Sequence, residues 1–414
     1  MKIVWLCNMT PSAVNQSRGG GGLWLDHVLE DIRVQKDITL RLFCPGGTET
    51  GRVDKQVEYV LFTEGAPQNY RKQLEELFYE QLQQFQPDVI HIWGTEYGHT
   101  LAMVNAAQRL GWENRVAISI QGLCSSCAWH YCEGVPEAVC HRYSLRDFLK
   151  RDNLLGQQKR FAQRGKLEQQ ALEKAGHVIG RTDFDRAVTG QINSHRRYHF
   201  CNETLREEFY QDVWRYSGCK KHRIFLSSAL FPFKGTHYLL EAMPLVLAEF
   251  PDAEIAVTGD SFFKTSLPAK LRQDYYHRYL ARLADQNKLR DRIRFLGALS
   301  APQMKQAFLD CNVFVLPSTI ENSPNSLGEA MLLGVPCVAA DVGGVSNMLH
   351  PGQGYVYQST APYMLAHYIM EVFRQQERAE EMGAQARLQA LETHNPEKNM
   401  RDLLEIYRLI AEER

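Results

Sequence analysis

The chain has 414 residues, of which 44% are hydrophobic, and this length favours two domains with sizeable cores. Its 47 basic and 48 acidic residues leave a formal net charge of -1, so no overall field would recruit nucleic acid or an anionic membrane. No apolar run approaches the roughly 20 residues of a membrane span, and the first residues read as a strand and not as a signal peptide. Ten cysteines without such a signal favour reduced thiols in a cytosol.

In the first half, short apolar runs alternate with segments of helical periodicity, which predicts a parallel sheet covered by helices. A loop after the first strand holds four consecutive glycines, including Gly20 and Gly21, and such a loop lets the backbone approach a ligand closely. The strands expected are 3–6, 39–43, 58–62, 88–93, 115–120 and 177–180, and the helices expected are 24–34, 70–85 and 159–175.

The second half repeats this alternation and predicts a second domain of the same class. We place the boundary between Cys201 and Cys219, where no strand pattern runs and 203–210 forms a short linker helix. The chain ends in an amphipathic helix over 399–412. The strands expected here are 222–228, 254–259, 292–297, 313–317 and 335–340, and the helices expected are 236–250, 271–287, 301–309 and a segment around 330–334.

The most informative stretch runs from Glu321 to Glu329 and continues to Gly343-Gly344. Together with the apolar run 313–317 before it, the stretch reads as strand, loop, helix, strand and glycine turn, which puts a helix N-terminus at the carboxyl edge of a parallel sheet. Free backbone N–H groups at a helix start attract phosphate. The two carboxylates would instead accept hydrogen bonds from hydroxyl groups. Phosphate and polyol recognition together suggest a sugar nucleotide.

These residues resemble the donor-site signature of the retaining glycosyltransferases of family 4, which have the fold called GT-B. The resemblance implies an α/β protein in which two doubly wound Rossmann-like domains face a central cleft. It implies an acceptor-binding domain over 1–205, a nucleotide-sugar domain over 220–394, and a terminal helix, 395–414, that packs back on the first domain. The matching positions are Glu321, Glu329, Ala330, Met331, Gly334, Pro336, Val338, Gly343 and Gly344.

The resemblance also implies roles for single residues on the donor side. Lys234, in a Lys-Gly before a helix, would pair with the donor diphosphate and stabilise the charge that grows on the leaving group. Glu321 would contact hydroxyls of the donor sugar or stabilise positive charge at the anomeric carbon, and Glu329 would accept from the ribose. The backbone around Asn325, Ser326 and Leu327 would lie near phosphate and sugar, Gly297 would border the nucleobase, and Gly20 and Gly21 would lie near the donor phosphates.

The chain departs from the family pattern at two positions. Ala229 stands where relatives carry a second cation, an Arg. Either one cation suffices there with help from backbone N–H groups, or an Arg from elsewhere substitutes, and Arg181 at the end of a first-domain strand is the candidate. Gln121 stands where relatives often carry a His, and Gln cannot act as a base. A retaining front-face reaction needs no base there, because the leaving phosphate oxygen can take the acceptor proton. Glu96 and His99 end another strand and are candidates for the acceptor pocket, although packing or capping is the plainer role for His99.

One cluster has spacings that could suit a metal: Cys124, Cys127, Cys132 and Cys140, with His130 and His141. Zinc could order the segment from Gly122 to Leu149, but free thiols are the plainer interpretation because the later spacings fit no common zinc module. The family resembled needs no catalytic metal, so we expect no cofactor beyond the nucleotide-diphosphate sugar.

The sequence therefore predicts a cytoplasmic retaining glycosyltransferase that moves a hexose-type unit to a hydroxyl of a glycan or lipid-linked acceptor. The resemblance implies a setting in bacterial polysaccharide or glycoconjugate assembly. Basic residues at Arg196-Arg197 and Lys220 to Arg223 are candidates for peripheral contact with the inner face of a membrane, with solvated surface as the plainer interpretation. A non-catalytic sugar-nucleotide sensor and a GT-B sugar-nucleotide epimerase stay open as alternatives, as do the donor, the acceptor and the oligomeric state.

Overall fold

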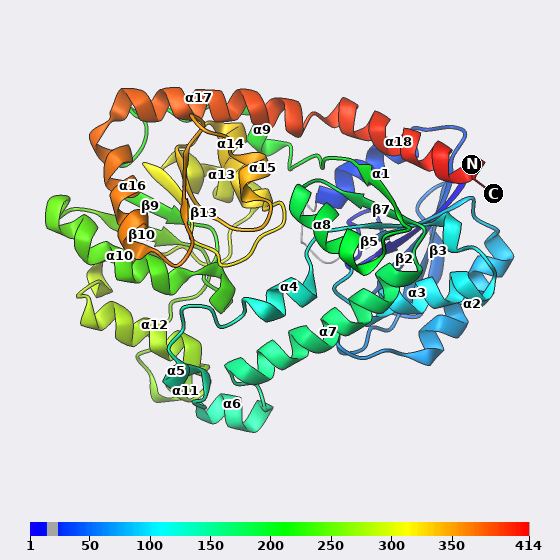
Figure 1. The fold of residues 1–414 in the computed structure, drawn as a ribbon, viewed down its shortest axis with the longest axis horizontal. Helices are drawn as coiled ribbons and strands as arrows, with labels where there is room; N and C mark the ends of the chain where they lie inside the picture. Colours follow the sequence, from blue (N-terminus) through cyan, green and yellow to red (C-terminus); the bar gives the residue numbers. More distant parts are fainter. Residues whose placement is uncertain (15–23, 414) are drawn as a thin grey trace. The chain divides into compact units, whose positions relative to one another are not determined.

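The structure is a computed structural model that describes residues 1–14 and 24–413. The chain divides into two compact units (Figure 1). Unit 1 comprises Met1–Ala128, Arg160–Arg206 and His394–Arg414, and unit 2 comprises Trp129–Lys159 and Glu207–Thr393. Gly20 and Gly21, predicted to lie near the donor phosphates, fall outside the described residues.

Unit 1 is built on an eight-stranded sheet in the order β3-β4-β2-β1-β5-β6-β7-β8. All neighbours pair in parallel except β3, which runs antiparallel to β4. The central strand β5 is buried along its whole length, as expected where helices cover both faces of a parallel sheet. Its strands are β1 (Lys2–Cys7), β2 (Thr39–Pro45), β3 (Thr50–Arg52), β4 (Val57–Phe62), β5 (Val89–Trp93), β6 (Val116–Ser119), β7 (His177–Gly180) and β8 (Arg197–Phe200).

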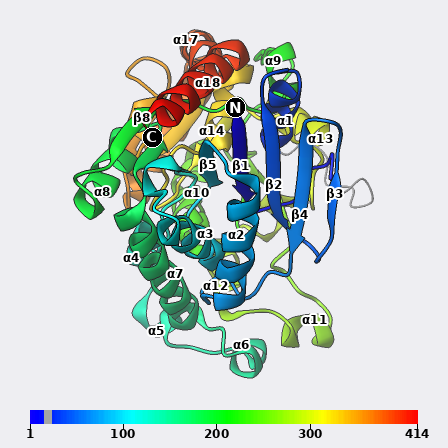
Figure 2. The ribbon, with the colours of Figure 1, turned by 90° about the vertical axis from the view of Figure 1, so that its right-hand side faces the viewer.

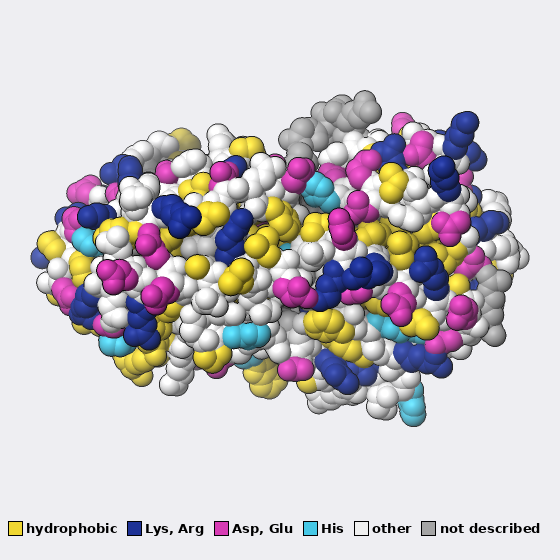
Figure 3. All heavy atoms as spheres, turned by 90° about the horizontal axis from the view of Figure 1, so that it is seen from above, with side chains coloured by type: hydrophobic (Ala, Val, Ile, Leu, Met, Phe, Trp, Pro, Cys, Tyr) yellow, Lys and Arg dark blue, Asp and Glu magenta, His cyan; other side chains and the backbone are white. Residues whose placement is uncertain are grey.

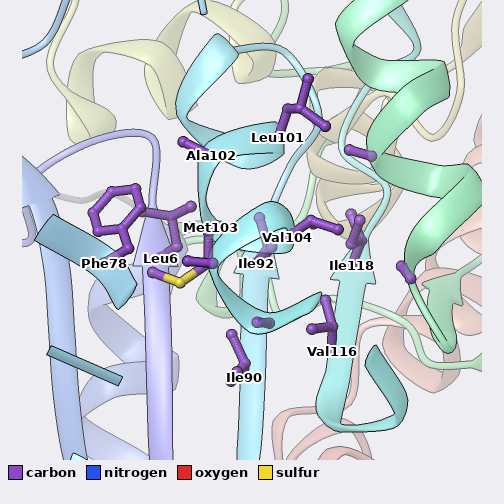
Figure 4. Close-up of a cluster of buried hydrophobic side chains, with 14 of the residues drawn as sticks. Leu6, Phe78, Ile90, Ile92, Leu101, Ala102, Met103, Val104, Val116 and Ile118 are labelled. Atoms are coloured by element: carbon purple, nitrogen blue, oxygen red, sulfur yellow. The ribbon is translucent and has the colours of Figure 1, made fainter. Parts of the chain in front are cut away.

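The helices of unit 1 pack their apolar sides on this sheet. Figure 4 shows Leu101 and Val104 of α3 in a buried cluster with Ile92 of β5 and Ile118 of β6. The helices are α1 (Trp24–Arg33), α2 (Lys72–Phe85), α3 (Gly98–Arg109), η1 (Glu113–Arg115), most of α4 (Cys124–Trp129) and of α7 (Leu154–Lys174), α8 (Asp183–Ile192) and α18 (Pro396–Glu412).

The terminal helix α18 belongs to unit 1. The hydroxyl of Tyr407 accepts a hydrogen bond from the indole N–H of Trp5 at 2.9 Å and lies 2.6 Å from Nδ1 of His91. At the end of the helix, Glu413 pairs with Arg197 of β8, and Figure 2 shows α18 beside this strand. A buried polar cluster therefore ties the last helix to the first strand of the chain.

Unit 2 has a six-stranded parallel sheet in the order β11-β10-β9-β12-β13-β14. The order reverses between β9 and β12, and ligands of open α/β sheets bind beyond the carboxyl ends of strands at such a point. The two parallel sheets confirm the predicted α/β class with two Rossmann-like domains. The strands are β9 (Arg223–Leu226), β10 (Glu254–Val257), β11 (Ile293–Phe295), β12 (Val313–Leu316), β13 (Cys337–Asp341) and β14 (Tyr355–Gln358).

The linker helix expected over 203–210 is a short helix, Glu208–Gln211. A second difference lies at the predicted helix 271–287. It begins at Tyr275, because the carboxylate of Asp274 caps its first turn by accepting from the N–H of His277 at 3.0 Å. The helices are α5 (Glu137–Cys140), α6 (Leu145–Lys150), α9 (Glu208–Gln211), η2 (Pro232–Lys234), α10 (Thr236–Glu249), α11 (Leu267–Leu271), α12 (Tyr275–Gln286), η3 (Arg290–Arg292), α13 (Ala301–Leu309), α14 (Asn325–Leu333), α15 (Val345–Met348), α16 (Pro362–Arg374) and α17 (Gln376–Thr393).

Residues 129–159 differ from the predicted domain range 1–205, because they cluster with unit 2. Their contacts give the reason. The ring of Tyr131 is fully buried and packs edge-on against Phe233 at 5.7 Å between centroids. Gly134 lies so close to Tyr238 that an added Cβ would be 1.9 Å from the tyrosine oxygen. This segment of the first half of the sequence is therefore part of the second core.

On the face in Figure 3, acidic and basic side chains are interspersed, in agreement with a formal net charge of -1. None of the helices in the described part of the chain combines the length and apolar character needed to cross a bilayer.

Candidate functional site

Lys234 and Glu321 meet at the carboxyl edge of the sheet of unit 2. Lys234 ends the short helix η2 after β9, and Glu321 lies in the loop after β12. The ammonium nitrogen of Lys234 is 2.6 Å from Oε1 of Glu321. Ser318 donates its hydroxyl to the same oxygen at 2.7 Å. The structure thus brings together the two residues that the sequence marked as a cation for phosphate and a carboxylate for sugar, and it adds Ser318 as a partner that holds the carboxylate.

Two glycines allow the surrounding loops to approach this pair. Gly235 has φ +70°, and an added Cβ would lie 1.8 Å from the carbonyl oxygen of Pro317. Gly343 has φ +52°, and its added Cβ would lie 1.8 Å from the carbonyl oxygen of Glu321. That oxygen also accepts from the N–H of Gly344 at 3.1 Å. Larger side chains at Gly235 or Gly343 would push the loops apart, so both glycines are needed for the position of Glu321.

The helix α14 begins directly after this loop, with Pro324 before its first residue and no side-chain cap. The carbonyl oxygen of Pro324 accepts from the N–H groups of Leu327 and Gly328. The N–H groups at the first positions of a helix have no partner within the helix and favour an anion. Asn325 is half-buried and begins the helix, whereas the Leu327 side chain is fully buried, so Leu327 could contact a ligand only through its backbone.

Three further residues predicted for the donor side lie close to this helix start or at the same edge of the sheet. Ser326 is half-buried in the first turn of α14, and Glu329 is buried one turn further on. Gly297 follows β11 with φ +70° and accepts at its carbonyl oxygen from the N–H of Gly259 at 2.8 Å. These residues belong to unit 2 and lie near the carboxyl edge of its sheet, and their roles toward a donor stay predictions.

A pocket of about 560 Å³ opens at the carboxyl ends of β9, β10 and β11. Ala229 lines it, at the position where the resembled family carries an Arg. Lys264 and Arg272 line it too, from an insertion between β10 and α12 that the sequence reading did not single out. The full lining is Ser228, Ala229, Leu230, Thr258, Gly259, Asp260, Ser261, Phe262, Lys264, Arg272, Gln273, Asp274, His277, Gly297, Ala298, Leu299 and Met304.

The 129–159 segment contacts the loops that carry Lys234 and Glu321. The hydroxyl of Thr319 donates to the backbone carbonyl oxygen of His130 at 3.0 Å. The carbonyl oxygen of Glu133 lies 3.2 Å from Nε2 of His237 in α10. The side chains of His130 and Glu133 pair with each other at 2.5 Å. This support of the site was missed by sequence reasoning, since no local pattern relates these residues to Lys234.

In unit 1, Glu96 and His99 share one partner, Asn8. The amide nitrogen of Asn8 donates to Oε2 of Glu96 at 2.8 Å, and its oxygen is 2.9 Å from Nε2 of His99. Because that oxygen can only accept, Nε2 of His99 must carry the proton. Burial is the main cause that raises the pKa of Glu96 to about 7 and lowers the pKa of His99 to about 3. The cluster therefore holds a carboxyl group that takes up a proton near neutral pH, a property typical of functional sites.

Arg181 and Gln121 share a partner, Glu203, which was not predicted as a site residue. The guanidinium of the buried Arg181 pairs with Glu203 and donates to the carbonyl oxygen of Ile120 at 3.0 Å. The amide nitrogen of Gln121 donates to the other oxygen of Glu203. The charge of Arg181 is thus balanced by Glu203 within unit 1. The role of Arg181 as a second cation for the donor phosphates stays a prediction, and in that role its guanidinium would have to separate from Glu203.

The Cys and His residues considered for zinc do not assemble into a site in the part of the chain that the structure describes, where no group of three His, Cys, Asp or Glu side chains is placed to hold a metal ion. The ten cysteines all lie in the described residues, and none of them forms a disulfide. Cys124 opens α4, whose first N–H groups are capped by the carboxylate of Glu168, which accepts from Cys124 and Ser125 at 2.8 and 3.1 Å. A buried carboxylate therefore orders the start of this segment.

The second half of the chain matches a known family. Residues 217–389 match the model of the family Glycosyl transferases group 1. The GDP-mannose-dependent monoacylated alpha-(1-6)-phosphatidylinositol monomannoside mannosyltransferase of Corynebacterium glutamicum is 29% identical over 171 residues. That match covers 40% of this chain and 41% of the mannosyltransferase, so the chain matches about two fifths of its relative's length.

Solved structures resemble the whole chain. Sucrose-phosphate synthase from Thermosynechococcus elongatus superposes with a TM-score of 0.70 at 16% identity, over 100% of both chains. The Anabaena protein HepE in complex with UDP and glucose gives a TM-score of 0.67 at 16% identity, over 98% of this chain and 99% of HepE. At such identities the likeness shows the fold alone, which is GT-B. Within this fold, the match to the model of the family Glycosyl transferases group 1 covers residues 217–389.

Proposed function

We propose that the protein is a retaining glycosyltransferase that uses a nucleotide-diphosphate sugar. The observation that carries the proposal is the pair of Lys234 and Glu321, 2.6 Å apart, beside the uncapped start of α14. An ammonium group and free helix N–H groups at one edge suit a diphosphate, and a carboxylate among them suits the hydroxyls of a sugar. This combination is what transfer from a nucleotide sugar requires.

In this proposal, Lys234 and the N-terminus of α14 stabilise the negative charge that develops on the leaving diphosphate. Glu321, held by Ser318, orients the donor sugar and stabilises positive charge at its anomeric carbon. Glu329 accepts from the ribose, and Gly297 borders the nucleobase. The leaving phosphate oxygen takes the proton of the acceptor hydroxyl, so the anomeric configuration is kept and neither a catalytic metal nor another cofactor takes part.

The sugar transferred is of the hexose type, and the acceptor is a hydroxyl of a glycan or a lipid-linked glycan. Names of similar proteins support the donor class: one relative uses GDP-mannose, and structures of HepE hold UDP or UDP-glucose. We assign the protein to the cytoplasm, with peripheral contact to the inner face of the membrane, and to bacterial polysaccharide or glycoconjugate assembly. Because the relatives use different bases, the donor has to be found by experiment.

The test is a panel of UDP-, GDP- and ADP-sugars, with release of nucleoside diphosphate measured for the wild type and for Lys234→Ala. We expect slow release from one donor and a loss of about 100-fold or more in the variant, as for other groups that stabilise transition-state charge. Lys166→Ala is the matched control, because Lys166 is exposed on α7. Unchanged release by Lys234→Ala would contradict the proposed site.

Two other results would favour the alternatives. Tight donor binding without release, even with acceptor extracts, would indicate a sugar-nucleotide sensor. Conversion of one sugar nucleotide into its epimer would indicate an epimerase. The product of transfer also reports the stereochemistry, since the coupling constant of its anomeric proton distinguishes retention from inversion.

A further inference from the structure

A short helix in the 129–159 segment exposes large apolar side chains. Phe148 and Leu149, at the end of α6, are 71% and 72% exposed, and Tyr143 and Leu145 at its start are also exposed. Singly exposed apolar residues are common on protein surfaces, but adjacent large ones at one helix mark a contact site.

The contacts of Asp147 determine which side of α6 faces the surface. The hydroxyl of Ser144 accepts from the N–H of Asp147 at 3.1 Å, and the carboxylate of Asp147 accepts in return from the N–H of Ser144 at 3.0 Å. The same carboxylate accepts from the N–H of Tyr275, the first residue of α12, at 2.8 Å. Asp147 therefore fastens one side of the helix to the core of unit 2, and Phe148 and Leu149 remain at the surface.

A second helix from a distant part of the chain has the same character. In α11, Leu267 is 69% exposed and Leu271 is exposed as well. This helix leads directly into α12, to which α6 is fastened through Tyr275. Figures 1 and 2 show α5, α6 and α11 at the end of unit 2 that lies beyond α12 from the sheet. We call residues 141–151 and 264–272 the α6–α11 surface.

Basic residues predominate in the same two segments. The α6–α11 surface holds seven basic residues and one acidic residue, whereas the whole chain is balanced. The acidic residue, Asp147, is buried and paired with Arg146 at 3.1 Å. The basic residues are Arg142, Arg146, Lys150, Arg151, Lys264, Lys270 and Arg272.

Exposed apolar side chains together with an excess of basic residues fit one kind of partner. Lys and Arg near a bilayer attract anionic headgroups, while Phe and Leu enter the boundary between headgroups and acyl chains. A symmetric contact with a second copy would bring the basic residues of both copies together, and the repulsion between like charges opposes this. Charge therefore favours an anionic lipid surface over self-association.

Two of the basic residues at Arg196-Arg197 and Lys220 to Arg223 already have acidic partners. Arg197 pairs with Glu413. Arg223 is buried and its guanidinium pairs with Glu254. The charges of Arg197 and Arg223 are thus balanced within their own units. On the α6–α11 surface Arg146 also has acidic partners, Asp147 and, at 2.9 Å, Asp152, but the two segments together still hold seven basic residues and one acidic residue.

We propose that the α6–α11 surface is a membrane-docking site that binds anionic lipid headgroups and inserts Phe148, Leu149 and Leu267 at the bilayer interface. Such docking would hold unit 2, which carries Lys234 and Glu321, at a membrane. The proposal does not depend on the transferase reaction, because lipid binding is measured without a donor.

The test is sedimentation of the full chain with vesicles of phosphatidylcholine alone and of equal parts phosphatidylcholine and phosphatidylglycerol. We expect binding to the anionic vesicles, a decline with added salt, and little binding to phosphatidylcholine alone. Phe148→Ser combined with Leu149→Ser should lower the partition coefficient by about tenfold or more. Lys150→Glu combined with Lys270→Glu should lower it by a similar factor or more.

The matched control is Leu388→Ser in α17, where the side chain is 64% exposed and lies outside this surface. All these positions are exposed, so thermal unfolding of each variant should match that of the wild type. Equal binding of the wild type and the Phe148/Leu149 variant would overturn the proposal, as would no binding of the wild type to anionic vesicles. A concentration-dependent dimer that the same variant abolishes, without vesicle binding, would assign the surface to a second copy instead.

Discussion

Thr319, two residues before Glu321, donates its hydroxyl to the backbone carbonyl oxygen of His130, which lies 189 positions earlier in the chain. The contact joins the loop of the candidate donor carboxylate to a segment from the first half of the sequence, within one compact unit. Next to it, Tyr131 packs on Phe233, the neighbour of Lys234. Both loops of the Lys234–Glu321 pair are therefore supported from the same segment.

Tyr131→Ala should show how much this support contributes. The ring is fully buried, and its hydroxyl donates to Gln157 at 2.5 Å. Removing a buried aromatic ring should lower the free energy of unfolding of unit 2 by about 3–5 kcal/mol, because a cavity is left against Phe233. Urea unfolding measures this loss, and KM for the donor should rise at temperatures where the variant is still folded.

The control is Tyr363→Ala, since Tyr363 is exposed on α16. That change should alter stability by no more than about 0.5 kcal/mol. A stability of Tyr131→Ala equal to that of the control would mean that the 129–159 segment adds nothing to the core of unit 2.

Ser318 is expected to act on donor chemistry only through Glu321. Its buried hydroxyl donates to Oε1 of Glu321 at 2.7 Å, the oxygen that also contacts Lys234. Ser318→Ala removes this bond but keeps both charges, so kcat should fall by about tenfold while KM changes less. Ser318→Thr, which keeps the hydroxyl, should restore part of the rate.

Kinetics with the donor identified from the panel would measure both parameters. Ser318→Ala must also be compared with Glu321→Gln, which alters the carboxylate itself and should cost more. If Ser318→Ala lowered kcat as much as Glu321→Gln, Ser318 would have to contact the substrate directly and the positioning role would be wrong.

Gly343→Ala should separate steric conflict from backbone strain. A Cβ at Gly343 would lie 1.8 Å from the carbonyl oxygen of Glu321, whereas at Gly352, with φ +87°, the space within 4 Å is open. Gly352→Ala should therefore cost about 1–2 kcal/mol from the left-handed backbone alone. Gly343→Ala should cost more and should also weaken donor binding, because Glu321 must move.

Thermal unfolding and donor titration of the two variants provide the comparison. Equal losses of stability, with donor affinity unchanged in both, would show that the loops around Glu321 can shift without consequence.

The sequence was most informative where a signal is local. Strands such as β5 and β12 were predicted because they are buried on both faces and read as continuous apolar runs. The edge strands β3 and β8 were missed, since they are short and largely exposed and carry no such run. The order of strands and the pocket between β9 and β11 follow from packing, which a single sequence does not display.

The same division holds at the candidate site. Lys234, Glu321 and the glycines around them lie in short motifs, and the structure brings Lys234 and Glu321 into contact. The partners Ser318 and Glu203 could not be assigned, because a Ser or Glu in a loop has many possible roles. The association of residues 129–159 with unit 2 was hidden as well, since its contacts join residues far apart in sequence.

The last prediction concerns Glu96, whose pKa burial raises to about 7 from an ordinary value of 4.5. Below about pH 4.5 the carboxyl group is protonated in both the folded and the unfolded chain, so its contribution to stability is fully present. As the pH rises toward 7, the unfolded chain releases this proton more readily than the folded one, and stability is lost. The loss should total up to about 3 kcal/mol across that window.

Glu96→Gln tests this pH dependence, because it removes the titration and keeps an oxygen to accept from Asn8. Urea unfolding of wild type and variant at several pH values gives the difference in stability, in which the contribution of His99 cancels. The free energy of unfolding of the variant should rise steadily relative to that of the wild type between about pH 4.5 and about pH 7, and the difference should level off above about pH 7. If the difference in free energy of unfolding between variant and wild type stayed constant with pH, Glu96 would be ionised throughout this range. The cluster of Asn8, Glu96 and His99 would then hold no protonated carboxyl group near neutral pH that could act on an acceptor.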